Sequence, residues 1–197
     1  MRIVIATRNK DKILEIKHYF ADLDIEFVSL ERYPLLPEII EDKNTLIENA
    51  VKKAKEVSEF TDNIALADDS GLEVDALNGA PGVYSARFSG ENATYDDNNK
   101  KLLNLLKDIP LEKRTAHFKT VLALVFPDSR IQTVEGRCEG IIINEMRGTN
   151  GFGYDPIFFV PRLNKTFAEL TLHEKNTISH RAKALEKMKQ ILKSSLV

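Results

Sequence analysis

The architecture of the chain follows from residues 3–20, which read IVIATRNKDKILEIKHYF. The stretch begins with a β-branched apolar run, the pattern typical of a buried strand. Ile13, Ile16 and Phe20 then recur at helical spacing, so a helix is expected to follow. A polar loop, residues 7–12, separates the two elements. The order of strand, loop and helix predicts an α/β protein.

The same order of elements recurs further along the chain. Residues 26–30 read as a second strand, and an acidic, proline-containing loop spans residues 33–43. Thr45-x-x-Glu48 has the form of a capping box, which predicts that an amphipathic helix begins there. Residues 64–67 form an apolar run that predicts a buried strand ending just before the sequence DDSG, residues 68–71.

The second half of the chain is richer in strand patterns. Apolar residues alternate with period two over residues 118–126, and residues 141–143 form another apolar run, which together suggest antiparallel pairing. Helices are expected around residues 102–106 and 182–191. The sequence therefore predicts a mixed β-sheet with flanking helices, organised as a single domain over residues 1–197.

Composition limits the classes of function. The formal net charge of −2 and the pI of about 6.1 argue against a protein whose main task is to bind nucleic acid, but they allow a small anionic ligand. Cys138 is the only cysteine, so no intramolecular disulfide forms and a reducing compartment fits best. No stretch approaches the roughly 18 apolar residues of a membrane span, so a cytoplasmic protein is expected.

The polar loop of residues 7–12 is a candidate phosphate site. It lies between a strand and the N-terminus of a helix, where backbone N–H groups attract anions. For so short a motif taken alone, a solvated loop in which Thr7 or Asn9 caps the helix is the favoured interpretation. It is not a Walker A loop, because the chain lacks the required glycines followed by Lys-Ser/Thr.

The pair Asp68 and Asp69 is a candidate metal site. Adjacent carboxylates after an apolar strand favour a bound cation or a raised pKa. Mg²⁺ takes only one or two protein carboxylates, so Asp69 with one acid from residues 38–42 suffices. Strand alternation predicts that the two aspartates point apart and act differently. The alternative is a solvated Asp-Ser-Gly turn.

Two segments near the C-terminus are candidate base or phosphate contacts. Residues 151–156, GFGYDP, place aromatic rings and an acid on a glycine-rich backbone. Aromatic faces stack on bases, although a tight turn with one ring in the core is equally expected. Lys175, His180 and Arg181 gather near the start of the last helix, where an arginine donates to a carbonyl or phosphate. A solvated surface group is the alternative.

Taken together and in order, these motifs resemble the inosine triphosphate pyrophosphatase family, the non-canonical purine triphosphate pyrophosphatases. The resemblance rests on TRNKDK (residues 7–12), ADDSGL (67–72), GAPGVYSARF (79–88), GFGYDP (151–156) and SHR (179–181). It covers almost the whole chain. Its visible departure is Arg8, where the family often has glycine.

The resemblance implies an elongated α/β fold in which two lobes flank an active-site cleft, and a homodimer. It implies hydrolysis of ITP, dITP, XTP and dXTP to the monophosphate and pyrophosphate, with Mg²⁺ as cofactor, which sanitises the nucleotide pool. Water oriented by an acidic residue is expected to attack the α-phosphorus. A 6-oxo base accepts a hydrogen bond where adenine donates one, so donors aimed at that position select inosine and xanthine.

The family resemblance also assigns roles to individual residues. Asp69 is the expected catalytic proton acceptor and metal ligand, Glu41 the second metal contact, and Ser70 a substrate contact. The expected phosphate-side contacts are Thr7, Arg8, Asn9, Lys10, Asp11, Lys12 and Lys175, and the expected base contacts are Phe152, Gly153, Tyr154, Asp155, His180 and Arg181.

Two other functions compete with this interpretation. A non-catalytic nucleotide-binding protein on the same scaffold needs the aromatic loop and the basic residues, but it gains nothing from the acidic pair unless a cation binds. A pyrophosphatase for other modified nucleotides differs only in the residues that contact the base. Turnover that depends on a metal would exclude the nucleotide-binding protein. Selectivity for inosine and xanthine bases would exclude the pyrophosphatase for other modified nucleotides.

Overall fold

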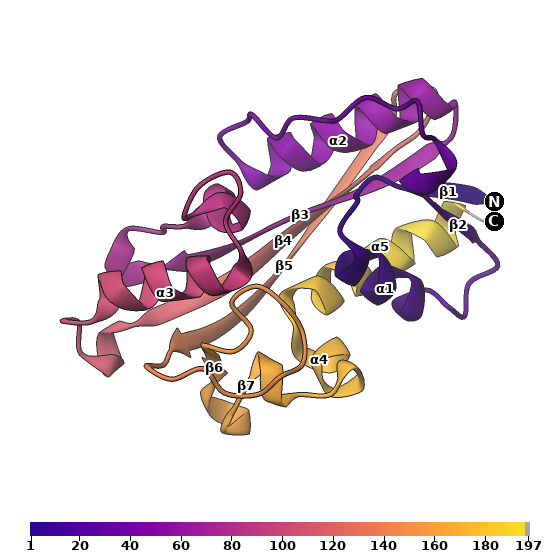
Figure 1. Ribbon diagram of the computed structural model, residues 1–197. Helices are drawn as coiled ribbons and strands as arrows, with labels where there is room; N and C mark the ends of the chain where they lie inside the picture. Colours follow the sequence, from indigo (N-terminus) through magenta and orange to yellow (C-terminus); the bar gives the residue numbers. More distant parts are fainter. Residues whose placement is uncertain (196–197) are drawn as a thin grey trace. The chain divides into compact units, whose positions relative to one another are not determined.

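The computed structural model describes residues 1–195 and contains an open, mixed β-sheet with helices packed on it (Figure 1). The sheet has seven strands in the order β2-β1-β3-β4-β5-β6-β7. The strands are β1 (Arg2–Ile5), β2 (Glu26–Ser29), β3 (Ile64–Val74), β4 (Thr115–Val125), β5 (Ile131–Ile142), β6 (Phe158–Val160) and β7 (Lys165–Thr166). Strand β1 is parallel to β2 and β3, whereas β6 is antiparallel to β5 and β7. The predicted α/β class and mixed sheet are confirmed.

The α-helices of the described residues are α1 (Lys10–Tyr19), α2 (Leu46–Thr61), α3 (Tyr95–Leu106), α4 (Leu172–Ile178) and α5 (His180–Ser195). Within residues 1–195, no helix is long and apolar enough to span a membrane.

The chain divides into two compact units, and each unit is built from segments that are not contiguous in the sequence. Unit 1 contains Met1–Asp69, Thr120–Gly136 and the chain from Arg181 onward, and unit 2 contains Ser70–Lys119 and Arg137–His180. The long strands β3, β4 and β5 contribute residues to both units. Assignment of the whole chain to a single domain stays a prediction.

The core of unit 1 contains the elements predicted from the first residues of the sequence. Its buried members are Ile3, Ile5, Ile16, Phe20, Leu66, Leu122, Leu124, Ala184, Leu185, Met188 and Leu192. Helix α1 begins after Asn9, whose side chain accepts hydrogen bonds from two backbone N–H groups of the first turn. Helix α2 begins after Thr45, whose hydroxyl oxygen accepts from the N–H of Glu48. The predicted first strand and the helix start at Thr45 are therefore confirmed, whereas α1 begins at Lys10, inside the segment expected as a loop.

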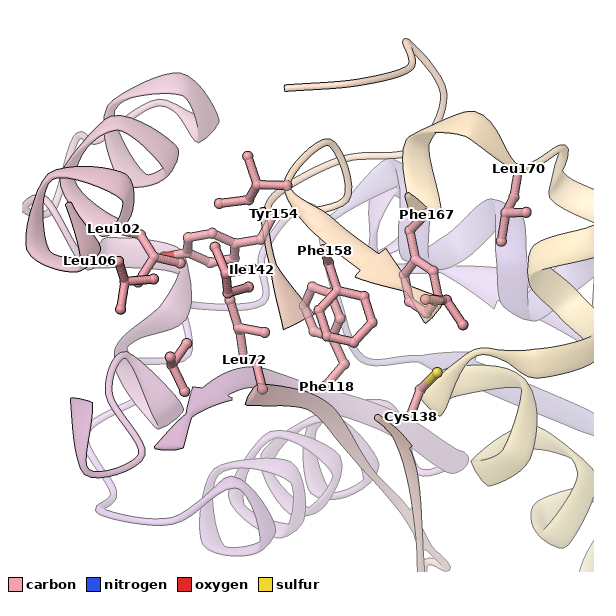
Figure 2. Packing of buried hydrophobic residues seen from close by; sticks show 14 residues of the cluster. Leu72, Leu102, Leu106, Phe118, Cys138, Ile142, Tyr154, Phe158, Phe167 and Leu170 are labelled. Carbon is pink, nitrogen blue, oxygen red and sulfur yellow. The ribbon is translucent and has the colours of Figure 1, made fainter. Parts of the chain in front are cut away.

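The core of unit 2 combines aliphatic side chains with a group of aromatic rings (Figure 2). The ring of Phe118 stacks on Phe167 with centroids 5.7 Å apart and tilts against Phe158 at 4.7 Å. Figure 2 shows these rings grouped together, with Tyr154 beside Leu102 of α3. Full burial of each phenylalanine contributes roughly 1.5–3 kcal/mol to stability, so this cluster is a rigid support for the loops attached to it.

The prediction that the strand ends at residue 67 is wrong, and so is the alternative of a turn at residues 68–71, because β3 continues to Val74. The strand continues because the buried carboxylates of Asp68 and Asp69 pair with cations instead of requiring solvent. Gly71 permits the continuation, since a Cβ there would lie 2.3 Å from the carbonyl oxygen of Gly82. The acidic pair therefore lies inside a strand.

Three other elements differ from the sequence prediction. Strand β5 begins at Ile131, ten residues before the apolar run that was expected to mark it, because its first part has mostly exposed polar side chains. Helix α4 was missed because it is only seven residues long, although Thr171 and Glu174 form a capping box at its start. The two-residue strand β7 gives no sequence signal.

Candidate active site

The segment expected as a polar loop, residues 7–12, lies in unit 1; residues 7–9 connect β1 to α1, and residues 10–12 form the first turn of α1. The amide oxygen of Asn9 accepts from the N–H groups of Asp11 and Lys12 at 3.0 and 3.1 Å, and the hydroxyl oxygen of Thr7 accepts from the N–H of Asn9. The cap predicted for Thr7 or Asn9 is thus made by Asn9. Lys10 and Asp11 are exposed. The loop places a helix N-terminus, with its partial positive charge, at the end of a buried strand.

Lys12 is fixed by the first aspartate of the acidic pair. Its Nζ lies 2.6 Å from Oδ1 of Asp68 and 3.3 Å from the backbone oxygen of the same residue. The side chain of Lys12 keeps 14% of its surface exposed, whereas that of Asp68 is fully buried. The ion pair therefore holds a partly accessible ammonium in one position, as phosphate binding requires.

Asp68 is the centre of a buried ion-pair network. Arg181 donates from Nε to Oδ2 of Asp68 at 2.7 Å and from Nη1 to Oε2 of Glu15 at 2.6 Å. Burial alone would raise the pKa of Asp68, but Arg181 and Lys12 hold it well below its ordinary value. Asp68 is therefore an anchor for two cations, and its lowered pKa favours the ionised form. Arg181, expected at the base, has its guanidinium buried in this network.

Asp69 has a different set of contacts. Its Oδ1 lies 2.9 Å from Nζ of Lys53, which also lies 2.6 Å from Oε1 of Glu41. Its Oδ2 is buried and has no hydrogen-bond partner. Burial raises the pKa of Asp69, Glu41 adds to this, and Lys53 and Lys12 oppose it without reversing it. The prediction that the two aspartates act differently is consistent with these separate partners.

Lys53 is a residue of this site that the sequence interpretation missed. It lies on α2 and donates to Asp68 O, Asp69 and Glu41. Burial lowers the pKa of Lys53, but Asp69 and Glu41 raise it above the ordinary value. A signal was available, because Lys53 shares the buried face of α2 with Ala50 and Val57 at helical spacing. A lysine on an apolar helical face requires carboxylate partners.

A pocket of about 160 Å³ lies beside these groups in unit 1. Its lining residues come from the end of β1, the acidic loop and α2, and they are Ala6, Thr7, Arg8, Leu30, Leu36, Pro37, Glu38, Ile39, Glu41 and Lys53. Part of the predicted phosphate loop therefore shares one pocket with the predicted metal contact Glu41. Arg8 is held at the pocket by a hydrogen bond from Nη2 to the carbonyl oxygen of Leu36.

The acidic groups of unit 1 fit a hard divalent cation that takes some of its ligands from the protein and the others from water and substrate. No group of three or more His, Cys, Asp or Glu side chains within residues 1–195 is arranged to hold a metal by itself. Asp69 and Glu41 are brought to the same ammonium, and Oδ2 of Asp69 is an oxygen without a donor. Mg²⁺ typically binds one or two carboxylates and completes its shell with water and phosphate oxygens, so this donor set suits it.

The glycine-rich loop of residues 151–156 lies in unit 2 and is organised by Asp155. Oδ2 of Asp155 accepts from the N–H of Phe152 at 2.9 Å and from Nζ of Lys175 at 2.7 Å. Gly151 has a φ of +74°, and a Cβ there would lie 2.0 Å from the same oxygen. Lys175 also lies 4.9 Å from the centroid of the Phe152 ring. Asp155 and Lys175 are both buried and together fix the loop.

The two aromatic rings of this loop have different surroundings. Tyr154 is buried in the core of unit 2, and its hydroxyl donates to the carbonyl oxygen of Ser85 at 2.9 Å. Phe152 is partly exposed. One ring in the core was the alternative expected for this loop, and stacking of the other ring on a base stays a prediction. His180 is buried and stacks on Phe118 at 4.6 Å.

The expected site residues thus fall into two groups. Unit 1 contains the expected phosphate loop, Glu41, Asp69 and Arg181, and unit 2 contains Ser70, the 152–155 segment, Lys175 and His180. Lys175 was expected at the phosphates or near them, and its contacts are with Phe152 and Asp155. The role of each residue towards substrate stays a prediction.

Comparison with known proteins gives a consistent set of relatives. The model of the Ham1 family matches residues 3–191. A dITP/XTP pyrophosphatase from Desulforamulus reducens is 53% identical over 192 residues, which cover 98% of this chain and 96% of that protein. A dITP/XTP pyrophosphatase from Geobacter sulfurreducens is 51% identical over 191 residues, covering 97% and 96%.

Solved structures agree with these sequence matches. A HAM1 protein from Coxiella burnetii superimposes with a TM-score of 0.91 at 42% identity, covering 98% of this chain and 99% of that one. The Ham1 protein of Staphylococcus aureus gives a TM-score of 0.89 at 39% identity, covering 99% and 100%.

Proposed function

The chain belongs to the Ham1 family, and from this premise we propose that it hydrolyses non-canonical purine nucleoside triphosphates, ITP, dITP, XTP and dXTP, to the monophosphate and pyrophosphate. It is accordingly a nucleoside-triphosphate diphosphatase, a hydrolase acting on acid anhydrides. The observation that carries the chemistry is Asp69, a buried carboxylate whose Oδ2 has no partner and whose second oxygen binds Lys53. A protein that only bound nucleotides would gain nothing from such a group unless it also bound a cation, so turnover that depends on a metal separates the two functions.

The residues of unit 1 act on the triphosphate. The N-terminus of α1 and the ammonium of Lys12 attract phosphate oxygens, and Asp68 keeps Lys12 in place. Arg8 and Thr7 line the pocket beside them. Because these groups are fixed before substrate binds, they stabilise the charge that develops during transfer without reorganising.

Asp69 is the proposed proton acceptor for the attacking water. Its raised pKa makes the carboxylate a stronger base than an ordinary aspartate, and the positive charge of Lys53 opposes the effect of burial. The deprotonated water attacks the α-phosphorus, and pyrophosphate leaves. Mg²⁺ held by Asp69 and Glu41 would supply neutralisation of phosphate charge and a lower pKa for a bound water.

The residues of unit 2 act on the base. We assign stacking to the partly exposed ring of Phe152, which Asp155 and Lys175 hold in position. Gly153, Tyr154 and His180 support the same loop or its surroundings, and Ser70 is a further substrate contact. Direct contact between Arg181 and the base stays a prediction, since its guanidinium donates to Asp68 and Glu15.

The proposal is tested by measuring pyrophosphate release from dITP, XTP, dGTP, dATP and dCTP, with magnesium and with a chelator. Strong magnesium-dependent release confined to dITP and XTP supports it. Release of orthophosphate would indicate a phosphatase, and equal activity on all bases would indicate a general nucleotide pyrophosphatase. Binding of dITP without turnover would indicate a nucleotide-binding protein.

Three further properties are part of the same proposal, namely Mg²⁺ as the cofactor, a homodimer and a cytoplasmic location. The first is supported by the donor set of Asp69 and Glu41. Replacing magnesium with manganese or calcium in the assay tests the cofactor. Sedimentation at micromolar concentration tests the dimer, and fractionation of cells tests the location.

A further inference from the structure

Helix α3 contacts the 151–156 loop at two places within unit 2. The rings of Tyr95 and Phe152 lie with centroids 6.1 Å apart, tilted by 39°. Four residues further along the helix, Asn99 donates from Nδ2 to the carbonyl oxygen of Gly153 at 2.8 Å. Residues separated by four positions share one face of a helix, so a single face of α3 meets the loop.

The hydrogen bond from Asn99 adds a second side-chain anchor to the backbone of the 151–156 loop. Asp155 accepts from the N–H of Phe152, and Asn99 donates to the carbonyl oxygen of the next residue, Gly153. Gly153 has a φ of +63°, so the chain changes direction there. Both polar backbone groups that bracket this change are therefore held by buried side chains, and the orientation of the Phe152 ring depends on both.

Stability alone does not explain an asparagine at this position. Asn99 is only 3% exposed, and its Oδ1 is buried without a hydrogen-bond partner. A buried acceptor that lacks a donor is unfavourable, and such groups call for an explanation in function. The Nδ2 group of Asn99 supplies such an explanation, because it donates to the 151–156 loop, which we assign to the base.

We propose that Asn99 is a positioning residue of the base site, which sets purine selectivity by holding the Gly153 carbonyl and thereby the Phe152 ring. This inference rests on the proposed function and adds to it a residue outside the sequence motifs. Asn99 acts through the loop and does not itself touch the substrate.

The neighbouring residue Asn98 provides a matched control. It is an asparagine on the same helix and is 2% exposed. Its Nδ2 donates to the carbonyl oxygen of Ala86, and its Oδ1 accepts from the N–H of Ser89. Asn98 therefore anchors residues 86–89, and a substitution there removes a buried amide of the same kind while the hydrogen bond from Asn99 to Gly153 stays in place.

The experiment compares wild type, Asn99→Ala, Asn99→Ser and Asn98→Ala by steady-state kinetics with dITP and dGTP, and by calorimetric binding of dIMP. We expect both Asn99 variants to lose about tenfold in the ratio of kcat/KM for dITP over dGTP, the effect of one lost hydrogen bond. The loss should appear in KM and in dIMP affinity more than in kcat. Asn98→Ala should lower Tm but keep the wild-type ratio.

Each outcome bears on a different claim. An unchanged ratio in a folded Asn99 variant, or an equal loss in Asn98→Ala, overturns the role of Asn99 while leaving the proposed function intact. Wild-type protein that does not hydrolyse dITP overturns the proposed function itself. The serine variant keeps the test decisive if the alanine variant fails to fold, because its hydroxyl fills part of the space but does not replace the amide donor.

Discussion

Asp68 and Asp69 are neighbours in one strand, yet their environments are opposite. Both oxygens of Asp68 lie against cations, from Lys12 on one side and Arg181 on the other. Asp69 binds a single ammonium through one oxygen and leaves the other without a donor. Burial acts on both carboxyls, but the pKa of Asp68 is lowered whereas that of Asp69 is raised.

The difference teaches how one buried strand provides both an anchor and a reactive group. Alternation of side chains along a strand sends adjacent residues to opposite faces, where they meet different helices. A fully satisfied buried carboxylate contributes rigidity, and a partly satisfied one retains capacity to bind a cation or a proton. The contrast predicts that substitutions of the two residues affect different properties of the protein.

Replacement of the reactive group should have the largest effect. Asp69→Asn keeps the shape of the side chain but removes the proton acceptor, so kcat for dITP should fall by about 10²- to 10⁴-fold. The free energy of unfolding at neutral pH should stay the same or rise, because a carboxyl with a raised pKa is less stable ionised in the folded state than in water. Stopped assays of pyrophosphate and chemical denaturation measure the two quantities. Substantial turnover in metal-replete Asp69→Asn contradicts the assignment.

Replacement of the anchor should act on stability. Asp68→Asn leaves Arg181 and Lys12 without their shared counterion, and loss of one partner of a buried pair costs about 3–5 kcal/mol. The folded-state pKa of Asp68 lies below the unfolded value, so its stabilising contribution is complete above that unfolded value and is lost as pH falls towards the folded pKa. The stability gap between variant and wild type should therefore be full at pH 7 and narrow under strongly acid conditions. A gap that is constant with pH would show that the carboxylate charge is not responsible.

The acidic pair also shows how far the sequence could be interpreted. The alternating pattern was enough to separate the two aspartates, and the capping signals at Asn9 and Thr45 gave the helix starts. The continuation of β3 through Asp68 and Asp69 could not be predicted, because it depends on cations from distant parts of the chain. Arg181, for example, is 113 residues from Asp68.

The same limitation applies to the candidate site. The family resemblance predicted both Asp155 and Lys175 as site residues, but it did not predict their contact with each other. Lys53 and Asn99 were missed because each acts from the middle of a helix on a loop or strand far away in sequence. Only the position of Lys53 on an apolar helical face gave a usable signal.

Lys53, the lysine that contacts both Asp69 and Glu41, offers a further test of the contrast between the two aspartates, with a smaller expected effect. Lys53→Met removes the charge that opposes the effect of burial on Asp69, so the pKa of Asp69 should rise further. The acid limb of the pH profile of kcat/KM should move to higher pH, and kcat/KM near pH 7 should fall about tenfold, the loss expected for one charge-assisted hydrogen bond. A profile that keeps its acid limb while activity falls would show that Lys53 acts on substrate and not on Asp69. Lys52→Met, which removes an exposed neighbour bound to Asp42, is the control.

Substitutions of Asn9 test whether a side chain that already makes hydrogen bonds within the protein also contacts the substrate. Its Oδ1 caps α1, so Asn9→Ala should cost about 1 kcal/mol of unfolding free energy. Serine is also an effective cap, so Asn9→Ser should recover that stability. If Asn9 contacts phosphate as the family resemblance implies, KM for dITP stays raised in Asn9→Ser, because a hydroxyl does not replace an amide donor. Recovery of both stability and KM would place Asn9 with Asp68 among the anchors and remove it from the substrate contacts.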